Sequence, residues 1–231
     1  MGCQNTPGSA SNTAGGNSYV CLAYTAPFTT EYSAVGYIHT ESGDQGPDHA
    51  IVYCTACGGN GLDGAVDLGV APGGTSSEAL DFYVGFGDAA DGQTHAIYWP
   101  HGSSPAVLLP MPAGVSAHVH SEAHAVNSAG EIVGFYALAN DPQQIGTRAV
   151  LWEPDATAAD GSGYIAYDLS SLLPATAGGL ALSQAYAITC EGDVAADGVP
   201  SAWQGDAENA VLHTHRYLVS REGGNGASCT P

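Results

Sequence analysis

Histidine is the residue type in this sequence with the widest chemical scope, and the chain holds nine of them. Five fall into two groups: a His-x-His pair followed four residues later by a third histidine, and a second His-x-His pair near the C-terminus. Residues i and i+2 of a strand point to the same face, so each pair can present two imidazoles to one ion. Several imidazoles together suit Zn²⁺ or Cu²⁺, and water bound to such an ion is a nucleophile. The candidate metal ligands are His118, His120, His124, His213 and His215, with Glu122 as a further ligand or base.

The same histidines also have a structural interpretation. His215 holds a position in a sequence repeat that His49, His95 and Arg148 hold in the other copies. A neutral imidazole at the start of a strand can bond a neighbouring backbone carbonyl, which requires no metal. Two hypotheses therefore stand: a metal-dependent enzyme built on the five histidines, and a protein without catalysis in which histidines support the fold.

Other catalytic and cofactor-binding signatures are missing from the sequence. The chain has no lysine, which rules out a P-loop, and it has neither a G-x-S-x-G nor an H-E-x-x-H segment. Residues 59–64 spell G-x-G-x-x-G but lead into a strand-like segment, so no helix N-terminus follows to hold a pyrophosphate. Aspartates in the loops can bind Ca²⁺, yet none has the EF-hand spacing. We expect no catalytic residue and no cofactor. If the chain binds a metal ion, the candidates are Zn²⁺, Cu²⁺ and Ca²⁺.

An internal repeat determines which elements position these side chains. Its clearest motif is His-Ala-Ile, which occurs at residues 49–51 and 95–97. The corresponding residues are Arg-Ala-Val at 148–150 and a degenerate His-Arg-Tyr at 215–217. An apolar segment precedes each copy, and Asp-Gly pairs that favour hairpin turns lie between apolar runs. Each unit contains four short segments with the composition of strands, and four strands in about 40 to 50 residues are typical of a propeller blade. The prediction is an all-β, β-propeller-like fold of about four blades, each with about four short antiparallel strands.

The repeat also sets the expected domain boundaries. It covers residues 18–222, which we predict to be one domain. Residues 1–17 form a tail rich in serine, glycine and asparagine, which is too polar to fold by itself. Residues 223–231 form a short C-terminal tail.

The order of the words in the repeat resembles that of the bacterial extracellular HAF-repeat proteins. The words A-x-A-[IV]-N, G-x-[IV]-V-G, H-A-[FI]-x-W and D-L-G follow one another, most completely from residue 123 to Trp152 and again in residues 66–74. Here isoleucine or valine replaces the usual phenylalanine, and the last copy is eroded. The resemblance spans residues 18–222 and implies a propeller-like β-fold outside the cytoplasm. It implies no catalytic residues, because the family shares none.

The charge of the chain limits its partners. With three arginines, no lysine and 23 acidic residues, the formal net charge is −20. Such a surface repels phosphate backbones and anionic lipids, which excludes nucleic acid as a partner. No apolar run reaches the length of a membrane span. The excess charge has two interpretations, solubility of a β-rich protein and attraction of cations.

Six cysteines in an acidic, strand-rich chain indicate disulfide bonds and an oxidising compartment. We predict a local bond within a C-x-x-C segment, and one bond that ties each end of the chain to the domain. This favours a secreted or cell-surface protein, and a lipid anchor on the first cysteine is the alternative. The predicted pairs are Cys54 with Cys57, Cys190 with Cys229, and Cys3 with Cys21.

Together these patterns favour a non-enzymatic scaffold that is extracellular or lies at the cell surface. Such a scaffold binds a protein or glycan partner or serves structurally, and self-assembly is a further option because four blades are few for a closed ring. The aromatic residues Tyr53, Trp99 and Trp152 recur in register, which predicts either a packed layer between blades or a platform for carbohydrate. The alternative function is the metal-dependent enzyme that uses the histidine-rich site.

Overall fold

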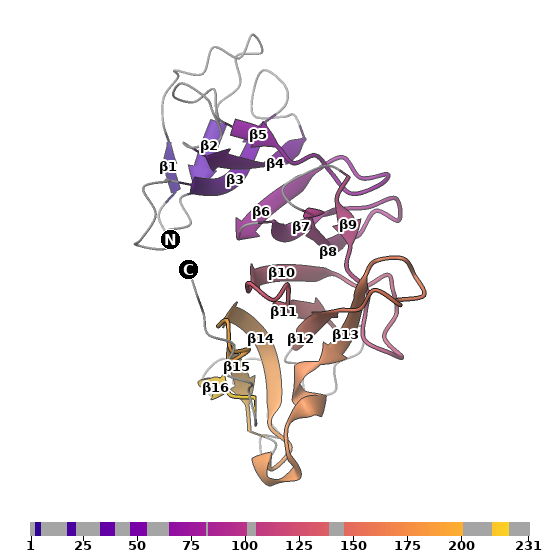
Figure 1. Cartoon of the computed structure of the whole chain (residues 1–231), viewed down its shortest axis with the longest axis vertical. Helices are drawn as coiled ribbons and strands as arrows, with labels where there is room; N and C mark the ends of the chain where they lie inside the picture. Colours follow the sequence, from indigo (N-terminus) through magenta and orange to yellow (C-terminus); the bar gives the residue numbers. More distant parts are fainter. Residues whose placement is uncertain are drawn as a thin grey trace. The chain divides into compact units, whose positions relative to one another are not determined.

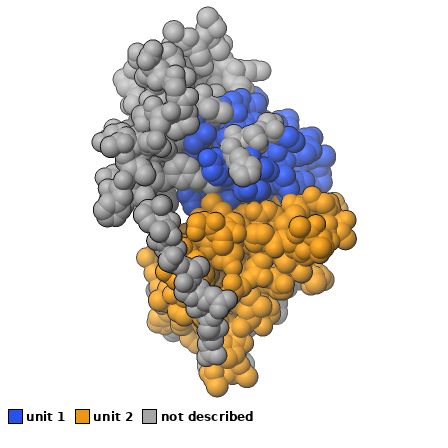
Figure 2. All heavy atoms as spheres, in the orientation of Figure 1, with its two compact units in different colours: residues 1–108 blue, residues 109–231 orange. Residues whose placement is uncertain are grey.

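The computed structural model describes residues 3–5, 18–21, 33–39, 47–54, 65–81, 83–100, 105–138, 146–200 and 214–221. These residues form strands and two short 3₁₀ helices, with no α-helix among them, so the predicted all-β class is confirmed. The chain divides into two compact units, residues 1–108 and 109–231 (Figure 2). Each unit contains two sheets in which the described strands are antiparallel and follow one another in sequence order. The single domain predicted for residues 18–222 stays a prediction.

Unit 1 contains sheets A and B (Figure 1). Sheet A consists of β1 (Cys3–Asn5), β2 (Ser18–Cys21), β3 (Ser33–His39), β4 (Asp48–Cys54) and β5 (Ala65–Asp67). Sheet B consists of β6 (Ser77–Asp81), β7 (Val84–Asp88), β8 (Thr94–Tyr98) and β9 (Val107–Leu108). The first strand of sheet B, β6, packs against β3 and β4 of sheet A.

Unit 2 contains sheets C and D (Figure 1). Sheet C consists of β10 (Ser121–Val126), β11 (Ile132–Ala137), β12 (Thr147–Pro154) and β13 (Tyr164–Asp168). The 3₁₀ helices η3 (Leu169–Leu172) and η4 (Ala175–Ala177) lead to sheet D, which consists of β14 (Ala181–Ile188), β15 (Val194–Val199) and β16 (His215–Val219). As in unit 1, the first strand of the later sheet covers the earlier one, because β14 packs against β10, β11 and β12.

The first two strands of sheets B, C and D share a register. In each sheet the pairing shifts one residue after an alanine, and that alanine lies opposite Gly85, Gly134 or Ala196. Such a shift is a β-bulge, in which one residue of the first strand has no partner across the sheet. The residues at the three bulges are Leu80, His124 and Tyr186. The position of this bulge is therefore the same in these sheets, whereas the side chain at the bulge differs.

The glycine of the repeat is required by a close approach of two strands. A Cβ atom on Gly134 would lie 1.9 Å from the backbone oxygen of Glu122, and one on Gly85 would lie 2.0 Å from that of Glu78. No side chain fits at such distances unless the backbone shifts. The glycine in the repeated word G-x-[IV]-V-G therefore has a steric reason.

The aromatic position of the repeat is filled by tryptophan in sheets B and C. Trp99 and Trp152 are both fully buried. The indole N–H of Trp99 donates to the carbonyl of Gly69 at 3.3 Å, and that of Trp152 donates to the carbonyl of Pro110 at 2.7 Å. Buried rings with satisfied N–H groups favour the packed layer over the carbohydrate platform at these two positions.

The pairing of strands identifies the same position in the other two sheets. Trp152 lies opposite the first residue of β11, Ile132, and its counterpart in sheet D is Val219, opposite Val194. In sheet A the position belongs to Tyr53, opposite Ala34. The side chain of Tyr53 lies outside the described residues. Sheet D is therefore the described sheet in which a small residue, a valine, replaces the aromatic residue of the repeat.

The described residues test other predictions from the sequence only in part. Ring closure and the number of blades stay predictions. Cys3 lies opposite Cys21 in the pairing of β1 with β2, but Cys57 and Cys229 lie outside the described residues, so the disulfide pairs also stay predictions. Within the described ranges, no helix is long and apolar enough to span a membrane.

Candidate functional site

Two of the five predicted metal ligands come together in unit 2. His120, just before β10, and His124, at the bulge of β10, both contact the carboxylate of Glu122. The distances are 3.0 Å from His120 Nε2 to Oε1 and 3.4 Å from His124 Nε2 to Oε2. Both imidazole rings also pack against the ring of Phe135, with centroids 5.5 and 5.4 Å away. The i, i+2 spacing brings this group together, because alternate residues of a strand point to the same face.

The other predicted ligands do not join this group in the described chain. His118 is exposed in the turn before β10, where its backbone N–H donates to the hydroxyl of Ser116. His215 is exposed on β16, with its ring against the edge of Tyr217. His213 lies outside the described residues. Across the part of the chain that is described, no group of three His, Cys, Asp or Glu side chains is arranged to hold a metal ion.

The bulge residue His124 also connects sheet C to sheet D. Its Nδ1 lies 2.9 Å from the backbone oxygen of Ala185, and its ring stacks on that of Tyr186, with centroids 5.6 Å apart. A carbonyl oxygen only accepts, so Nδ1 carries the hydrogen and donates it. Burial raises the pKa of Glu122, but the hydrogen bond from His124 and the charge of His120 outweigh burial and lower it. The carboxylate of Glu122 is therefore held in its charged form between the two imidazoles.

Sheet D repeats this arrangement with a neutral residue in place of Glu122 and with the carboxylate, Asp197, on the neighbouring strand. Gln184 stands in the position of Glu122, and Tyr186 stands in the position of His124. The hydroxyl of Tyr186 lies 2.7 Å from Oε1 of Gln184 and 3.1 Å from Oδ2 of Asp197. Burial and the charge of Asp197 raise the pKa of Tyr186. The bulges of sheets C and D thus each carry a polar pair along one strand, carboxylate with imidazole in sheet C and amide with phenol in sheet D.

The aspartates of the loop between β12 and β13 act as turn-forming residues. Asp155 accepts hydrogen bonds from the backbone N–H and the hydroxyl of Thr157, and Asp160 accepts the same pair from Ser162. These bonds lower the pKa of both carboxyls. Turn formation thus accounts for these two candidates for Ca²⁺ binding.

A cavity of about 570 Å³ lies between sheets C and D. Its walls are mainly apolar, and its charged residues are Glu131, Glu153 and Arg221. A volume of this size is within the range of about 300 to 1,000 Å³ that is usual for ligand pockets. The apolar and aromatic side chains that line it are Leu151, Tyr167, Leu169, Leu172, Pro174, Ile188, Val194 and Val219.

The valine of sheet D accounts for part of this cavity. In unit 1, Trp99 of sheet B packs into a core with Val52 of sheet A and with Leu68, which follows that sheet. In unit 2 the equivalent residue of sheet D is Val219, which packs against a core that includes Leu151 and Leu169. A valine fills much less space than an indole, so the space that a tryptophan fills in unit 1 stays partly open in unit 2.

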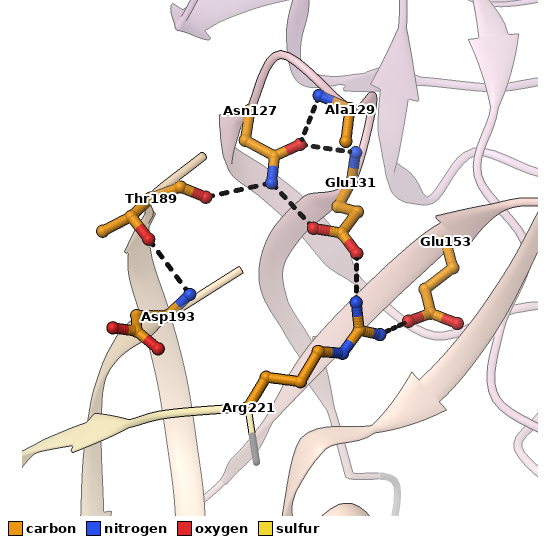
Figure 3. A network of polar contacts seen from close by, with 7 residues as sticks. All are labelled: Asn127, Ala129, Glu131, Glu153, Thr189, Asp193 and Arg221. Carbon is orange, nitrogen blue, oxygen red and sulfur yellow. Dashed lines mark hydrogen bonds and ion pairs between the residues drawn. The ribbon is translucent and has the colours of Figure 1, made fainter. Parts of the chain in front are cut away.

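The charged residues of the cavity form one network (Figure 3). The guanidinium of Arg221 donates from Nη1 to Oε1 of Glu131 at 2.7 Å and from Nη2 to Oε1 of Glu153. The side-chain amide of Asn127 donates to the other oxygen of Glu131 at 2.7 Å and to the backbone oxygen of Thr189 at 3.0 Å. The network joins the β10–β11 hairpin, the β14–β15 hairpin and the segment after β16.

Local sequence explains how Glu131 is positioned. Asn127 ends the first word of the repeat, and its side-chain oxygen accepts from the backbone N–H groups of Ala129 and Glu131, at 3.0 Å each. Gly130, at φ 81°, completes the turn. The hairpin therefore presents the carboxylate of Glu131 at the cavity in a fixed position.

The electrostatics of the cavity favour a cation. Two carboxylates face one guanidinium, so the net charge of the three groups is negative. Burial alone would lower the pKa of Arg221, but Glu131 and Glu153 raise it, and the guanidinium stays charged.

The sequence analysis did not predict Glu131, Glu153 or Arg221 as site residues. One feature of the sequence does mark the cavity: Val219 stands at a position where the other copies of the repeat carry an aromatic residue.

Comparison of the chain with protein-family models, with curated proteins and with solved structures gives no significant match in any of the three. The resemblance to HAF-repeat proteins therefore depends on the words in the sequence.

Proposed function

We propose that the protein is a non-enzymatic repeat scaffold, secreted or held at the cell surface, which binds a protein or glycan partner. In this proposal the four sheets are blades of a propeller-like domain. The resemblance to HAF-repeat proteins supports a location outside the cytoplasm. The net charge of −20 supports a soluble scaffold that does not associate with nucleic acid.

A single observation carries the binding function: the repeat is interrupted where the cavity of unit 2 lies. In sheets B and C the aromatic position holds a tryptophan that is fully buried. In sheet D it holds Val219, which lines a cavity of about 570 Å³. Leaving this space open costs stability, because unfilled core volume forfeits packing. A binding function explains why the fold tolerates that cost.

The test of this function is a screen with a matched variant. The labelled full chain and its Val219→Trp variant are screened in parallel against a glycan array and against purified secreted proteins of the source organism. We expect one ligand class to bind the wild type and to lose binding in the variant, whose tryptophan occupies part of the cavity and obstructs the ligand. Absence of any ligand in both screens, or equal binding by both proteins, would contradict the proposal.

One observation favours the alternative of a metal-dependent enzyme. His120, Glu122 and His124 meet in unit 2, and Nδ1 of His124 donates to a backbone carbonyl, as the second nitrogen of metal-bound histidines does. Elemental analysis of the purified full chain separates the two functions. Stoichiometric Zn²⁺ or Cu²⁺ that is lost from the His120→Ala variant would favour the enzyme. A folded protein without bound metal would remove it.

A further inference from the structure

We propose that the cavity between sheets C and D binds a basic peptide segment in which an arginine is flanked by aliphatic side chains, and that Arg221 holds the place of the ligand's arginine in the unoccupied protein. This inference rests on the proposed function, because it names the partner of the same cavity.

The walls of the cavity select for apolar groups. Leu151, Leu169 and Val194 are buried there, and Leu172 at the same cavity is half exposed, at 50%. An aliphatic side chain that enters such a space removes apolar surface from water on both partners. The cavity, of about 570 Å³, includes the place of an indole and is larger than it, so it has room for more than one side chain of a peptide.

The charges select for a cation beside those apolar groups. An anionic ligand would meet two carboxylates and only one guanidinium, so it would be repelled. A cation meets a site that already holds one, since Glu131 and Glu153 both accept hydrogen bonds from Arg221. The whole chain is acidic, at −20, and attracts basic partners over longer distances.

The geometry selects for a guanidinium over an ammonium. Glu131 precedes β11 and Glu153 lies on β12, and each takes one terminal nitrogen of the same planar group. A planar fork with several donors satisfies two separate carboxylates at once, which a single ammonium does less well. Arg221 is half exposed, with 49% of its side chain accessible, so a second guanidinium can reach the same carboxylates.

Arg221 therefore competes with the ligand. It reaches the carboxylates from the segment after β16 and leaves the apolar walls of the cavity to be filled by the partner. A peptide that brings both an arginine and aliphatic side chains gains contacts that Arg221 alone does not make. Removal of Arg221 should then strengthen binding, because the competent state becomes the dominant one.

The experiment is calorimetric titration of the full chain with two matched peptides. The first is N-acetyl-leucyl-arginyl-leucinamide, and the second carries citrulline, the neutral isostere of arginine, in its place. We expect the arginine peptide to bind roughly tenfold more tightly than the citrulline peptide, because charge-assisted hydrogen bonds are lost in the second. Equal affinity for the two peptides would overturn the inference.

Four variants at the cavity and one control variant outside it test the site. Val219→Trp should abolish binding of the arginine peptide, and Glu153→Gln should weaken it roughly tenfold. Arg221→Gln should strengthen it roughly tenfold. Leu172→Ala should weaken it about threefold, whereas Leu218→Ala, at an exposed leucine of β16 that does not line the cavity, should leave it unchanged.

The outcomes distinguish this inference from the proposed function. If the arginine peptide fails to bind both the wild type and Arg221→Gln, the inference is wrong. If, in that case, a glycan or another protein still binds in a manner that Val219→Trp abolishes, the proposed function stands with a different ligand. Should Val219→Trp fail to fold, the pair Arg221→Gln and Glu153→Gln, with opposite expected effects, decides the question.

Discussion

Sheets C and D of unit 2 are two copies of one module that differ at a few positions. Their first two strands share a bulge at equivalent places, with His124 in one sheet and Tyr186 in the other. Sheet C keeps the tryptophan and the glycine of the repeat, whereas sheet D carries Val219 and Ala196 at those positions. The strands of the module therefore form even where the tryptophan and the glycine of the repeat are replaced. The replacements in sheet D affect the cavity between sheets C and D and the charged groups that line it.

The largest expected effect comes from giving sheet C the residue of sheet D. Trp152→Val should lower the free energy of unfolding by about 3 kcal/mol, because a fully buried indole is replaced by a smaller side chain and leaves a cavity. The indole N–H also donates to the carbonyl of Pro110, which would lose that partner. Urea unfolding followed by circular dichroism measures the change.

The control for this prediction is the reverse substitution. Val219→Trp should raise the stability or leave it unchanged, because it fills a space that already exists. A loss of several kcal/mol in this variant would mean that the cavity cannot accept an indole. The equivalence of the two positions would then be wrong.

The second effect concerns the glycine of the repeat. Gly134→Ala should cost about 2 to 3 kcal/mol, because its Cβ atom would lie 1.9 Å from the backbone oxygen of Glu122. Sheet D accommodates a Cβ at this register, since Ala196 is buried there, and its strands carry a second register shift after Leu182. Ala196→Gly should therefore cost only about 1 kcal/mol. Thermal unfolding of both variants gives the ratio, and equal losses would contradict the difference between the sheets.

The sequence predicts the module well because its repeated motifs reflect steric and packing requirements of the strands. A glycine where strands approach closely and alternating apolar residues both act within one sheet, and the aromatic residue recurs in register. The prediction therefore extends to the all-β class and the antiparallel sheets. It could not extend to the cavity, because the cavity depends on how two copies pack against each other. The replacement of an aromatic residue by Val219 is visible in the sequence, but its consequence depends on that packing.

The candidate metal site was predicted in part for a related reason. His-x-His spacing assumes regular alternation along a strand, which places i and i+2 on one face. His120, Glu122 and His124 follow that alternation and share one face, whereas His118 lies in the turn before β10 and does not join them. The ring of His124 is also held by Ala185 and Tyr186 of sheet D, at the bulge. Bulges have no clear mark in a single sequence. In this chain the bulge is visible only as the middle residue of the word A-x-A.

A third, smaller effect concerns the hairpins that follow the bulges. Asn127 uses its side chain to accept two backbone N–H groups and to donate twice, whereas Thr189 accepts one N–H group, from Asp193 at 3.1 Å. Asn127→Ala should cost about 1 to 2 kcal/mol and Thr189→Ala about 0.5 to 1 kcal/mol, because fewer bonds are lost in the second. Urea unfolding of the two variants checks the order, and a larger loss in Thr189→Ala would reverse our account of the two turns.

The smallest effect is a difference in acid sensitivity between the two polar pairs. The pKa of Glu122 is lowered in the folded protein, so its carboxylate stabilises the fold above its ordinary pKa of 4.5. That contribution is lost as the pH falls through the lowered folded value. Glu122→Gln should therefore cost up to about 1 kcal/mol at pH 7, and the difference from the wild type should shrink toward zero at pH 3.

Sheet D supplies the control, since Gln184 carries no charge at the equivalent position. Gln184→Ala should change the stability less between the two pH values than Glu122→Gln does, because the amide itself does not titrate. Urea unfolding at pH 7 and pH 3 measures all four quantities. If the cost of Glu122→Gln is the same at both pH values, the two imidazoles do not favour the charged form of Glu122. The pairs in sheets C and D would then differ in shape alone.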